Sequence, residues 1–438
     1  MMHTYPPELE IVPLAKPPKL SIRVPGSKSI TNRALVLAAL CSRTGPCTLT
    51  GALQSEDTEV MIDCLTKLGF RISTDWNANI VIVHINETDR IIPAASAELF
   101  VGNSGTSVRF LTAMLALGHG KYRLDGVPRM RERPIRDLLD ALEQLGVKAT
   151  SEAGNGCPPV LIESTGIRTA GATIRGETSS QFVSALLMVA PLQDRGSLGF
   201  SIRVEGEAVS EPYIRMTEAM MSQWGATWTY DAKQRVYSFN HDSFAHYISP
   251  ASYAIEPDAS SASYFFAAAA ITVGSVTVLG MKRDMLQGDV RFVDVLETMG
   301  CRIEYRDDSI TVHGGNLRGV DVDMNAISDT VMTLAAVALF AEGPTTIRNV
   351  GHIRHKETDR IAAVATELRK LGAEVMEFAD GLTIVPRQLV GCAVDTYNDH
   401  RMAMSLALVG LRVPGVKVQN PGCVAKTYPG FWQDFKLI

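Results

Sequence analysis

One pattern occurs six times along this chain: a run of small and apolar residues typical of a buried helix, then a glycine, then a strand-like run. Between the copies lies a second pattern, an amphipathic helix that ends in an apolar residue followed by glycine. Five such glycines stand roughly 72 to 79 residues apart, which indicates a fold assembled from copies of one unit. The first pattern occupies residues 33–53, 106–126, 180–204, 260–279, 329–350 and 399–418, and the glycines of the second are Gly69, Gly146, Gly225, Gly300 and Gly372.

Helices of the first pattern have almost no polar face, so we expect them to be buried on most sides. Helices of the second pattern, such as residues 134–145 and 359–371, keep charges on one face. Each of them ends where a glycine can adopt a left-handed cap, and a short strand is expected to follow. The expected strands are residues 70–74, 147–150, 226–230, 301–305 and 373–378.

The length of 438 residues favours two domains over one. We assign three repeats to each domain and expect the chain to cross between them near residues 243–257, where two prolines and polar residues lie. A second crossover near residues 23–27 returns the N-terminal tail to the C-terminal half. The prediction is an α/β protein with one domain of residues 1–24 plus 253–438 and another of residues 25–252.

Composition excludes several classes of protein. The net charge of −5 gives no sign of a surface built for nucleic acid or for a membrane, and the apolar runs are too short to span a bilayer. The seven cysteines are scattered without a C-x-x-C pair, which fits reduced thiols in a cytoplasmic protein. No metal-ligand pattern or dinucleotide-binding motif occurs, so a cofactor-free transferase is favoured.

Hydroxyl and cationic residues gather where the helices of the N-terminal half begin. A helix N-terminus favours anions, so several such ends in one cleft would bind a heavily anionic substrate set. For each cluster alone, a capped helix start or a solvated loop is the simpler interpretation. Among the three arginines of residues 129–133 we favour Arg133, directly before a helix. The clusters are residues 25–33, 102–109, 129–134, 178–181 and 210–213.

The C-terminal half supplies acids together with cations. We expect Asp329 to cap the fifth buried helix and Asp399 to cap the sixth. Residues 355–360 combine two cations, two carboxylates and a helix start, and Lys426 lies in the final loop. One half thus offers hydroxyls and cations, and the other offers cations and acid/base groups. This is the layout expected of an interdomain active site.

Seven segments in this order resemble the signature segments of the 5-enolpyruvylshikimate-3-phosphate synthase family, over nearly the whole chain. The resemblance implies an inside-out α/β barrel in two domains, with six repeats, buried parallel helices and outer sheets. It also implies transfer of the enolpyruvyl group of phosphoenolpyruvate to the 5-hydroxyl of shikimate 3-phosphate, with release of phosphate and no cofactor. The segments are residues 25–29, 102–106, 129–134, 179–181, 356–360, 398–401 and 425–428.

The resemblance also implies roles for single residues. Lys28, Asp329, Glu357 and Lys426 are the expected catalytic residues, with Lys28 and Asp329 at the 5-hydroxyl and Glu357 at the methylene carbon. The positions that hold the shikimate phosphate match Ser179, Ser180 and Ser210, and those at the shikimate ring and carboxylate match Gln181, Tyr213, Ser29 and Arg33. The phosphoenolpyruvate cradle matches Arg133, Arg360, Arg401 and Lys426, with Asn103 and Gly105 close by. His352 and Lys356 complete the expected substrate contacts.

The chain departs from the family pattern at His352, where many members have Asn, and at Phe110 and Ser104 beside the phosphoenolpyruvate pocket. Gly105 leaves room for the family's phosphonate inhibitor glyphosate. The alternative is the sister enolpyruvyl transferase acting on UDP-N-acetylglucosamine, but Ser29 follows Lys28 where that enzyme typically has Asn. A catalytically silent binding protein and an RNA-end processing enzyme are more distant alternatives. We expect a cytoplasmic monomer that binds neither nucleic acid nor membrane.

Overall fold

The computed structural model describes residues 5–192, 199–239 and 247–438. The chain divides into two compact units: unit 1 comprises Met1–Gly26 and Glu256–Ile438, and unit 2 comprises Ser27–Ile255. Parts of three predicted features lie outside the described residues: the start of the N-terminal segment, the third copy at 180–204, and the crossover at 243–257.

Six sheets are built from the described residues, and all follow one plan. In each, two parallel neighbouring strands are extended by antiparallel pairing, as when β6 runs parallel to β7 and β7 antiparallel to β9. The sheets of unit 2 are β14 (Ser252–Ala254), β3 (Cys47–Thr50), β5 (Ile80–Val83) and β4 (Ile72–Asp75); β6 (Ser96–Phe100), β7 (His119–Asp125), β9 (Val160–Thr165) and β8 (Lys148–Ser151); and β10 (Gly171–Arg175), β11 (Phe200–Glu205), β13 (Val236–Phe239) and β12 (Thr229–Asp231).

Unit 1 contains the other three sheets, and one of them has only three strands. Both ends of the chain contribute, because β1 pairs with β23 and β2 pairs with β15. The sheets are β2 (Lys19–Ile22), β15 (Ser275–Leu279), β17 (Ser309–His313) and β16 (Arg302–Arg306); β18 (Asp321–Asp323), β19 (Thr345–Arg348), β21 (Gly381–Val385) and β20 (Glu374–Phe378); and β22 (Ala393–Val394), β23 (Lys417–Gln419) and β1 (Glu8–Glu10).

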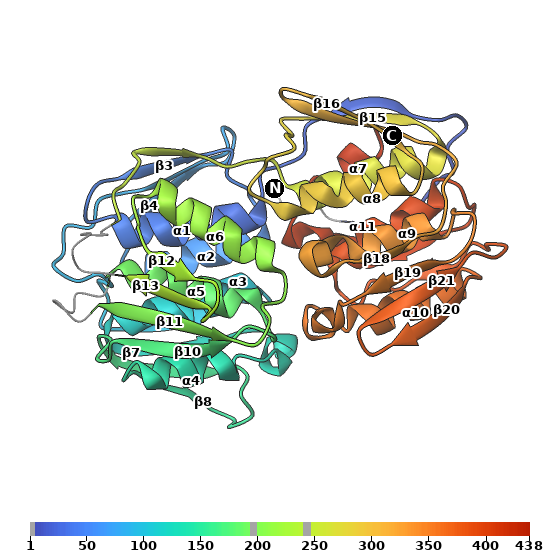
Figure 1. Ribbon diagram of the computed structural model, residues 1–438. Coiled ribbons are helices and arrows are strands. Elements are labelled where there is room, and N and C mark those ends of the chain that lie inside the picture. The colour runs from blue at the N-terminus through green and yellow to red at the C-terminus, as the bar shows by residue number, and fades with distance from the viewer. Residues whose placement is uncertain (1–4, 193–198, 240–246) are drawn as a thin grey trace. The chain divides into compact units, whose positions relative to one another are not determined.

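Helices fill the interior of each unit, and the sheets lie outside them (Figure 1). Every residue of α3, α9 and α11 is buried, as the small and apolar composition of these helices predicts. Six repeats with buried helices and outer sheets are the inside-out α/β architecture expected above. The interior helices are α1 (Lys28–Cys41), α3 (Gly105–Met114) and α5 (Ser180–Val189) in unit 2, and α7 (Ala259–Thr272), α9 (Val331–Ala338) and α11 (His400–Gly410) in unit 1.

The amphipathic helices bury one face and expose the other. In α4, for example, Leu138, Leu139 and Leu142 are buried while the acidic residues between them reach solvent. The helix expected over 134–145 begins at Arg136, so Pro134 precedes it. These helices are α2 (Glu56–Lys67), α4 (Arg136–Gln144), α6 (Glu211–Gln223), α8 (Phe292–Thr298) and α10 (Arg360–Lys370), followed by α12 (Phe431–Phe435) at the C-terminus.

All five glycines of the repeat adopt a positive φ, between 79° and 113°, directly after the amphipathic helices. This confirms their predicted left-handed caps. A side chain would also collide there: a Cβ on Gly300 would lie 2.6 Å from the carbonyl oxygen of Asn316. The strand predicted at 226–230 begins only at Thr229, because the amide of Ala226 donates to Met221 to close α6. None of the helices in the described ranges is both long and apolar enough to cross a membrane.

Candidate active-site residues

In unit 2, α1 begins with Ser27, whose hydroxyl accepts from the amide of Ile30 and so caps the helix. Lys28 follows, and its Nζ lies 3.2 Å from Oδ2 of Asp57. Asp57 belongs to the first turn of α2 and is buried. Sequence reasoning identified Lys28 but missed Asp57, the acid that fixes its position.

Arg33 lies one turn further along α1 and has 1% of its side chain exposed. Its guanidinium donates to Thr217 Oγ1 (2.7 Å) and to the carbonyl oxygens of Ser29 (3.0 Å) and Tyr213 (3.1 Å). It also lies over the rings of Phe110 and Tyr213. Burial lowers the pKa of Arg33 to about 10, which still leaves it cationic at neutral pH. The structure thus brings together Arg33, Ser29 and Tyr213.

A second cluster forms where α3 begins. Arg133 Nη1 donates to the carbonyl oxygen of Asn103 (2.8 Å) and contacts its side-chain oxygen at 3.3 Å. Gly105 allows this approach, because a Cβ there would lie 2.5 Å from Arg133 Nη2. Arg129 and Arg131 instead pair with Glu132 and Asp125 on the exposed surface, as expected of a solvated loop.

The helix α5 begins after Ser179, whose hydroxyl caps it by accepting from the amide of Gln181. Ser180 follows and is buried. The side chain of Gln181 accepts a hydrogen bond of 2.6 Å from Arg109 Nη1, which projects from the neighbouring helix α3. Arg109 ends the predicted cluster 102–109 but was given no role of its own, although an arginine inside an apolar helix is a signal that could have found one. Ser210 adopts a left-handed conformation (φ 51°) directly before α6 and is also buried.

Three hydrogen bonds link these helices to one another. Asn32 of α1 donates to Thr106 of α3, Arg109 of α3 donates to Gln181 of α5, and Arg33 of α1 donates to Thr217 of α6. The first turns of α1, α3 and α5 therefore lie together at one end of unit 2, and their helix N-termini and cations favour an anion there. This end carries the predicted residues Lys28, Ser29, Arg33, Asn103, Gly105, Arg133, Ser179, Ser180, Gln181, Ser210 and Tyr213.

In unit 1, the carboxylate of Asp329 accepts from three cations: Lys356 Nζ at 2.6 Å, Arg401 Nη2 at 2.7 Å and Arg360 Nη1 at 3.3 Å. Burial acts to raise the pKa of Asp329, but Arg401, Lys356 and Arg360 outweigh it and hold this pKa well below its usual value. The expectation that Asp329 caps a helix is wrong. Asp329 lies inside the 3-10 helix η6 (Asn325–Thr330), α9 starts at Val331, and the cations occupy the carboxylate.

Arg360 joins this carboxylate to two others. Its Nη2 donates to Glu357 Oε2 at 2.8 Å, and its Nε donates to Asp399 Oδ2 at 2.8 Å. Asp399 also accepts from the amide of Arg401 at 2.9 Å, which confirms its predicted role as the cap of α11. Glu357, Arg360, Asp399 and Arg401 are all buried. Their mutual hydrogen bonds offset the cost of removing these charges from water.

Lys356 and His352 both have lowered pKa values. Burial lowers the pKa of Lys356, although Asp329 opposes that effect. Burial and then Lys356 lower the pKa of His352, in η7 (Gly351–His355), to about 3, so its imidazole is neutral at neutral pH. Lys426 ends the 3-10 helix η8 (Pro421–Lys426) and is buried.

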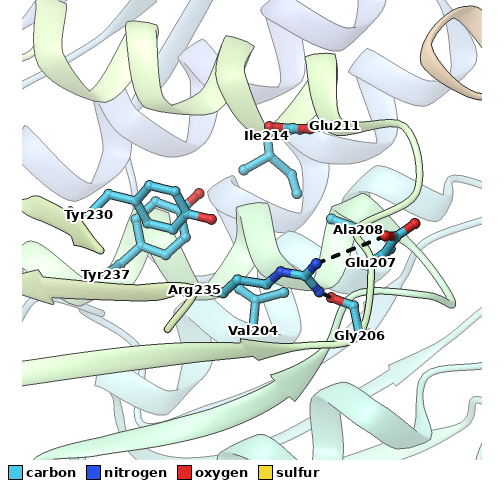
Figure 2. Close-up of a pocket in the computed structure, with 9 residues that line it drawn as sticks. All are labelled: Val204, Gly206, Glu207, Ala208, Glu211, Ile214, Tyr230, Arg235 and Tyr237. Atoms are coloured by element: carbon cyan, nitrogen blue, oxygen red, sulfur yellow. Dashed lines mark hydrogen bonds and ion pairs between the residues drawn. The ribbon is translucent and has the colours of Figure 1, made fainter. Parts of the chain in front are cut away.

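Two surface pockets of unit 2 lie away from the predicted residues. Figure 2 shows the first, of about 310 Å³, where Arg235 donates to the carbonyl of Gly206 and lies 4.0 Å from Glu207. Tyr230 and Tyr237 stack beside it with ring centres 4.4 Å apart. The second, of about 320 Å³, is lined by the acids Asp137, Asp140 and Glu205 together with Gln144, Thr173 and Arg175. Among the described residues, no group of three or more His, Cys, Asp or Glu side chains is placed to hold a metal ion.

The chain matches known proteins over nearly its whole length. A sequence model of the family described as EPSP synthase (3-phosphoshikimate 1-carboxyvinyltransferase) matches residues 15–435. A 3-phosphoshikimate 1-carboxyvinyltransferase of Nostoc punctiforme is 46% identical over 436 residues, covering 98% of each chain. One of Shewanella baltica is 47% identical over 426 residues, covering 95% of this chain and 96% of the relative.

Solved structures share the fold. An EPSP synthase from Acinetobacter baumannii superposes with a TM-score of 0.79 at 24% identity, covering 97% of both chains. The enolpyruvyl transferase NikO from Streptomyces tendae superposes with a TM-score of 0.72 at 19% identity, covering 98% of this chain and 97% of that one. The match of the family model over nearly the whole length, together with relatives of this identity, shows that the chain belongs to the EPSP synthase (3-phosphoshikimate 1-carboxyvinyltransferase) family.

Proposed function

We infer that the chain catalyses the reaction of its family. It transfers the enolpyruvyl group of phosphoenolpyruvate to the 5-hydroxyl of shikimate 3-phosphate and releases phosphate, a step of the shikimate pathway toward the aromatic amino acids. The family model and the curated relatives do not favour UDP-N-acetylglucosamine as the acceptor. The observation that best supports this function is the Asp329 carboxylate, which is bound by three cations and joined through Arg360 to Glu357.

The addition–elimination chemistry requires proton transfers at two atoms of the substrates. The 5-hydroxyl loses a proton as it attacks, and the methylene carbon of phosphoenolpyruvate gains one and later returns it. Asp329 and Lys28 act at the hydroxyl, and Glu357 acts at the methylene carbon. The lowered pKa of Asp329 keeps it ionised and thus able to accept a proton.

The cations around Asp329 serve two purposes in this proposal. Arg360 and Arg401 bind phosphoenolpyruvate, and Lys356 contacts the same anionic substrates. An anion that draws these cations toward itself weakens their hold on Asp329, so the pKa of Asp329 rises when substrate arrives. Asp329 then becomes a stronger base only in the loaded enzyme, which limits wasteful chemistry without substrate.

The remaining residues bind and orient the two substrates. Hydroxyls at the starts of α5 and α6 take the shikimate phosphate, and residues of α1 and α6 take the shikimate ring and carboxylate. The phosphoenolpyruvate cradle draws cations from both halves of the chain. The shikimate phosphate contacts are Ser179, Ser180 and Ser210; the ring and carboxylate contacts are Gln181, Tyr213, Ser29 and Arg33, with His352 nearby; and the cradle comprises Arg133, Arg360, Arg401 and Lys426 beside Asn103 and Gly105.

The proposed division of labour follows the two halves of the chain. Residues 25–252 bind mainly shikimate 3-phosphate, and residues 1–24 plus 253–438 carry the acid/base residues and part of the cradle. We further propose a cytoplasmic monomer whose partners are these two metabolites and not nucleic acid. The chemistry above uses only side chains of the chain itself.

Release of inorganic phosphate tests the function directly. The purified protein mixed with phosphoenolpyruvate and shikimate 3-phosphate is expected to release phosphate and to form the enolpyruvyl ether. UDP-N-acetylglucosamine in place of shikimate 3-phosphate serves as the control acceptor and is expected to give no release. Turnover with the control acceptor, or none with shikimate 3-phosphate, contradicts the proposal.

A further inference from the structure

The helix α10 carries a buried acid that takes no part in the reaction proposed above. Glu367 has no exposed side-chain surface. Its Oε1 accepts from the hydroxyl of Tyr397 at 2.7 Å, and its Oε2 accepts from the backbone amide of Asp395 at 3.0 Å. The partly exposed Lys370 reaches both oxygens, at 2.8 and 3.0 Å. A buried carboxylate with this many hydrogen-bond partners holds them in place, because breaking any of these hydrogen bonds leaves a buried polar group unsatisfied.

What Glu367 holds is a strained turn, residues 395–398. Tyr397 and Asn398 both adopt left-handed conformations, with φ of 52° and 53°. Two consecutive non-glycine residues in this region persist only where their surroundings enforce them. Two enforcing contacts come from Glu367, and a third is the bond from the amide of Tyr397 to Asp395 Oδ1 at 2.8 Å.

The strained turn leads directly into Asp399. The amide of Asp399 donates to the carbonyl of Thr396 at 2.8 Å, so the turn determines where α11 begins. Asp399 in turn binds Nε of Arg360 at 2.8 Å and the amide of Arg401 at 2.9 Å. The position of this turn therefore determines where the side chain of Arg360 and the backbone of Arg401 lie.

The geometry of α10 explains how one helix holds both ends of the segment 395–399. Arg360 and Glu367 are seven residues apart on α10, which places them on the same face, two turns and about 10.5 Å apart. Arg360 binds the end of the segment 395–399 and Glu367 binds its beginning. One helix face thus holds the segment at both ends and fixes its register.

We propose that Glu367 and Tyr397 are positioning residues, which hold the turn before Asp399 and so aim Arg360 and Arg401 at the anionic substrate. This inference rests on the roles of Arg360 and Arg401 in the proposed function. It assigns the pair to phosphoenolpyruvate rather than to shikimate 3-phosphate, because both arginines belong to the proposed phosphoenolpyruvate cradle. Neither Glu367 nor Tyr397 touches substrate in this account.

Tyr397→Phe is the sharpest variant, because it removes one hydroxyl and keeps the ring. Glu367→Gln removes the charge and leaves a single acceptor oxygen for the two donors of the turn, Tyr397 and Asp395. Lys370→Met is the matched control, since Lys370 binds the same carboxylate with a side chain that is 45% exposed. We expect the first two variants to raise KM for phosphoenolpyruvate at least about fivefold, with KM for shikimate 3-phosphate changed less than about twofold. Lys370→Met is expected to match the parent in both constants.

The double variant shows whether Glu367 and Tyr397 act through the same turn or affect the protein independently. If both residues act through the same turn, Glu367→Gln combined with Tyr397→Phe raises KM for phosphoenolpyruvate no more than the stronger single variant. A folded Tyr397→Phe protein with a lowered melting temperature and the parent's KM for phosphoenolpyruvate overturns the inference and leaves the proposed function intact. A parent protein that releases no phosphate with the two substrates overturns both.

Discussion

Arg360 and Asp399 form an ion pair from which water is excluded: Nε lies 2.8 Å from Oδ2, and the side chains are 1% and 0% exposed. Removing the charge of Asp399 takes away one of the three carboxylates that compensate Arg360 in a medium that solvates it poorly. The pair also joins the starts of α10 and α11, so it affects stability and substrate binding together.

Asp399→Asn tests this pair, because an amide oxygen can still cap α11 while the charge is lost. We expect the free energy of unfolding, measured by urea denaturation, to fall by about 3 kcal/mol. Asp321→Asn is the control, since Asp321 pairs with Arg348 on the exposed surface, and its effect is expected to stay below about 1 kcal/mol. Equal losses of unfolding free energy in the two variants would contradict the prediction that the buried pair contributes more than the exposed one.

Glu357→Gln tests the proposed proton transfer at the methylene carbon. The amide keeps an oxygen for the hydrogen bond from Arg360 Nη2 but cannot exchange a proton with carbon. We expect kcat to fall on the order of 10²-fold or more while the affinity for shikimate 3-phosphate stays within about twofold. Steady-state phosphate release and equilibrium binding measure the two quantities. Glu374→Gln, at an exposed ion pair, is the control, and near-normal turnover in Glu357→Gln refutes the role.

Gly105→Ala tests the close approach of Arg133. The new Cβ would lie 2.5 Å from Arg133 Nη2 and 2.9 Å from Arg109 Nη1, so these side-chain ends have to move. Because they are the far ends of flexible side chains, we expect little loss of stability and a KM for phosphoenolpyruvate raised on the order of tenfold. Gly430→Ala, where the nearest neighbour of a Cβ is Tyr428 Cε2 at 4.0 Å, is expected to leave KM unchanged. An unchanged KM in Gly105→Ala would exclude Arg133 from the cradle.

His352 gives the protein a specific sensitivity to acid. Its pKa, lowered to about 3 by burial, Lys356 and other cations and only partly restored by Asp329, lies below the ordinary value of 6.5. As pH falls from 6.5 toward 3, the unfolded chain binds a proton here and the folded chain does not, so stability is lost across this window. Asp329 adds to that loss only below its ordinary value of 3.8, where the unfolded chain binds a proton that the folded carboxylate still excludes.

The variant His352→Asn removes this titration. Between pH 7 and pH 5 we expect the parent to lose about 1–2 kcal/mol more of its unfolding free energy than the variant does, a range reduced because His352 is only partly buried. Urea denaturation of both proteins at the two pH values measures the difference. Parallel losses would mean that His352 carries its proton in the folded state.

Local sequence signals predicted the parts of this protein that depend on local chemistry. The five helix-ending glycines, the buried interior helices and the cap at Asp399 follow from periodicity and helix-end chemistry, and the structure has them as expected. The cap expected at Asp329 failed because residues 27, 31 and 72 positions away bind its carboxylate. No local pattern reports such partners.

The residues whose roles the sequence did not reveal also have partners that lie far away along the chain. Asp57, Arg109 and Glu367 each look like an ordinary helix residue, and their partners Lys28, Gln181 and Tyr397 lie 29, 72 and 30 positions away. A weak signal existed for two of them. Arg109 interrupts an apolar helix, and Glu367 lies on the same helix face as Arg360, two turns away.

The pairing of β1 with β23 and of β2 with β15 has a consequence for synthesis on the ribosome. Residues 27–255 can leave the exit tunnel and complete all of their own sheets, whereas the earlier-made strand at residues 8–10 finds its neighbour only when residues 417–419 emerge. The strand at residues 8–10 therefore stays unpaired for nearly the whole of translation. A premature stop codon shortly before residue 417 would leave that edge uncovered in an otherwise almost finished molecule, exposed to proteases and to other copies.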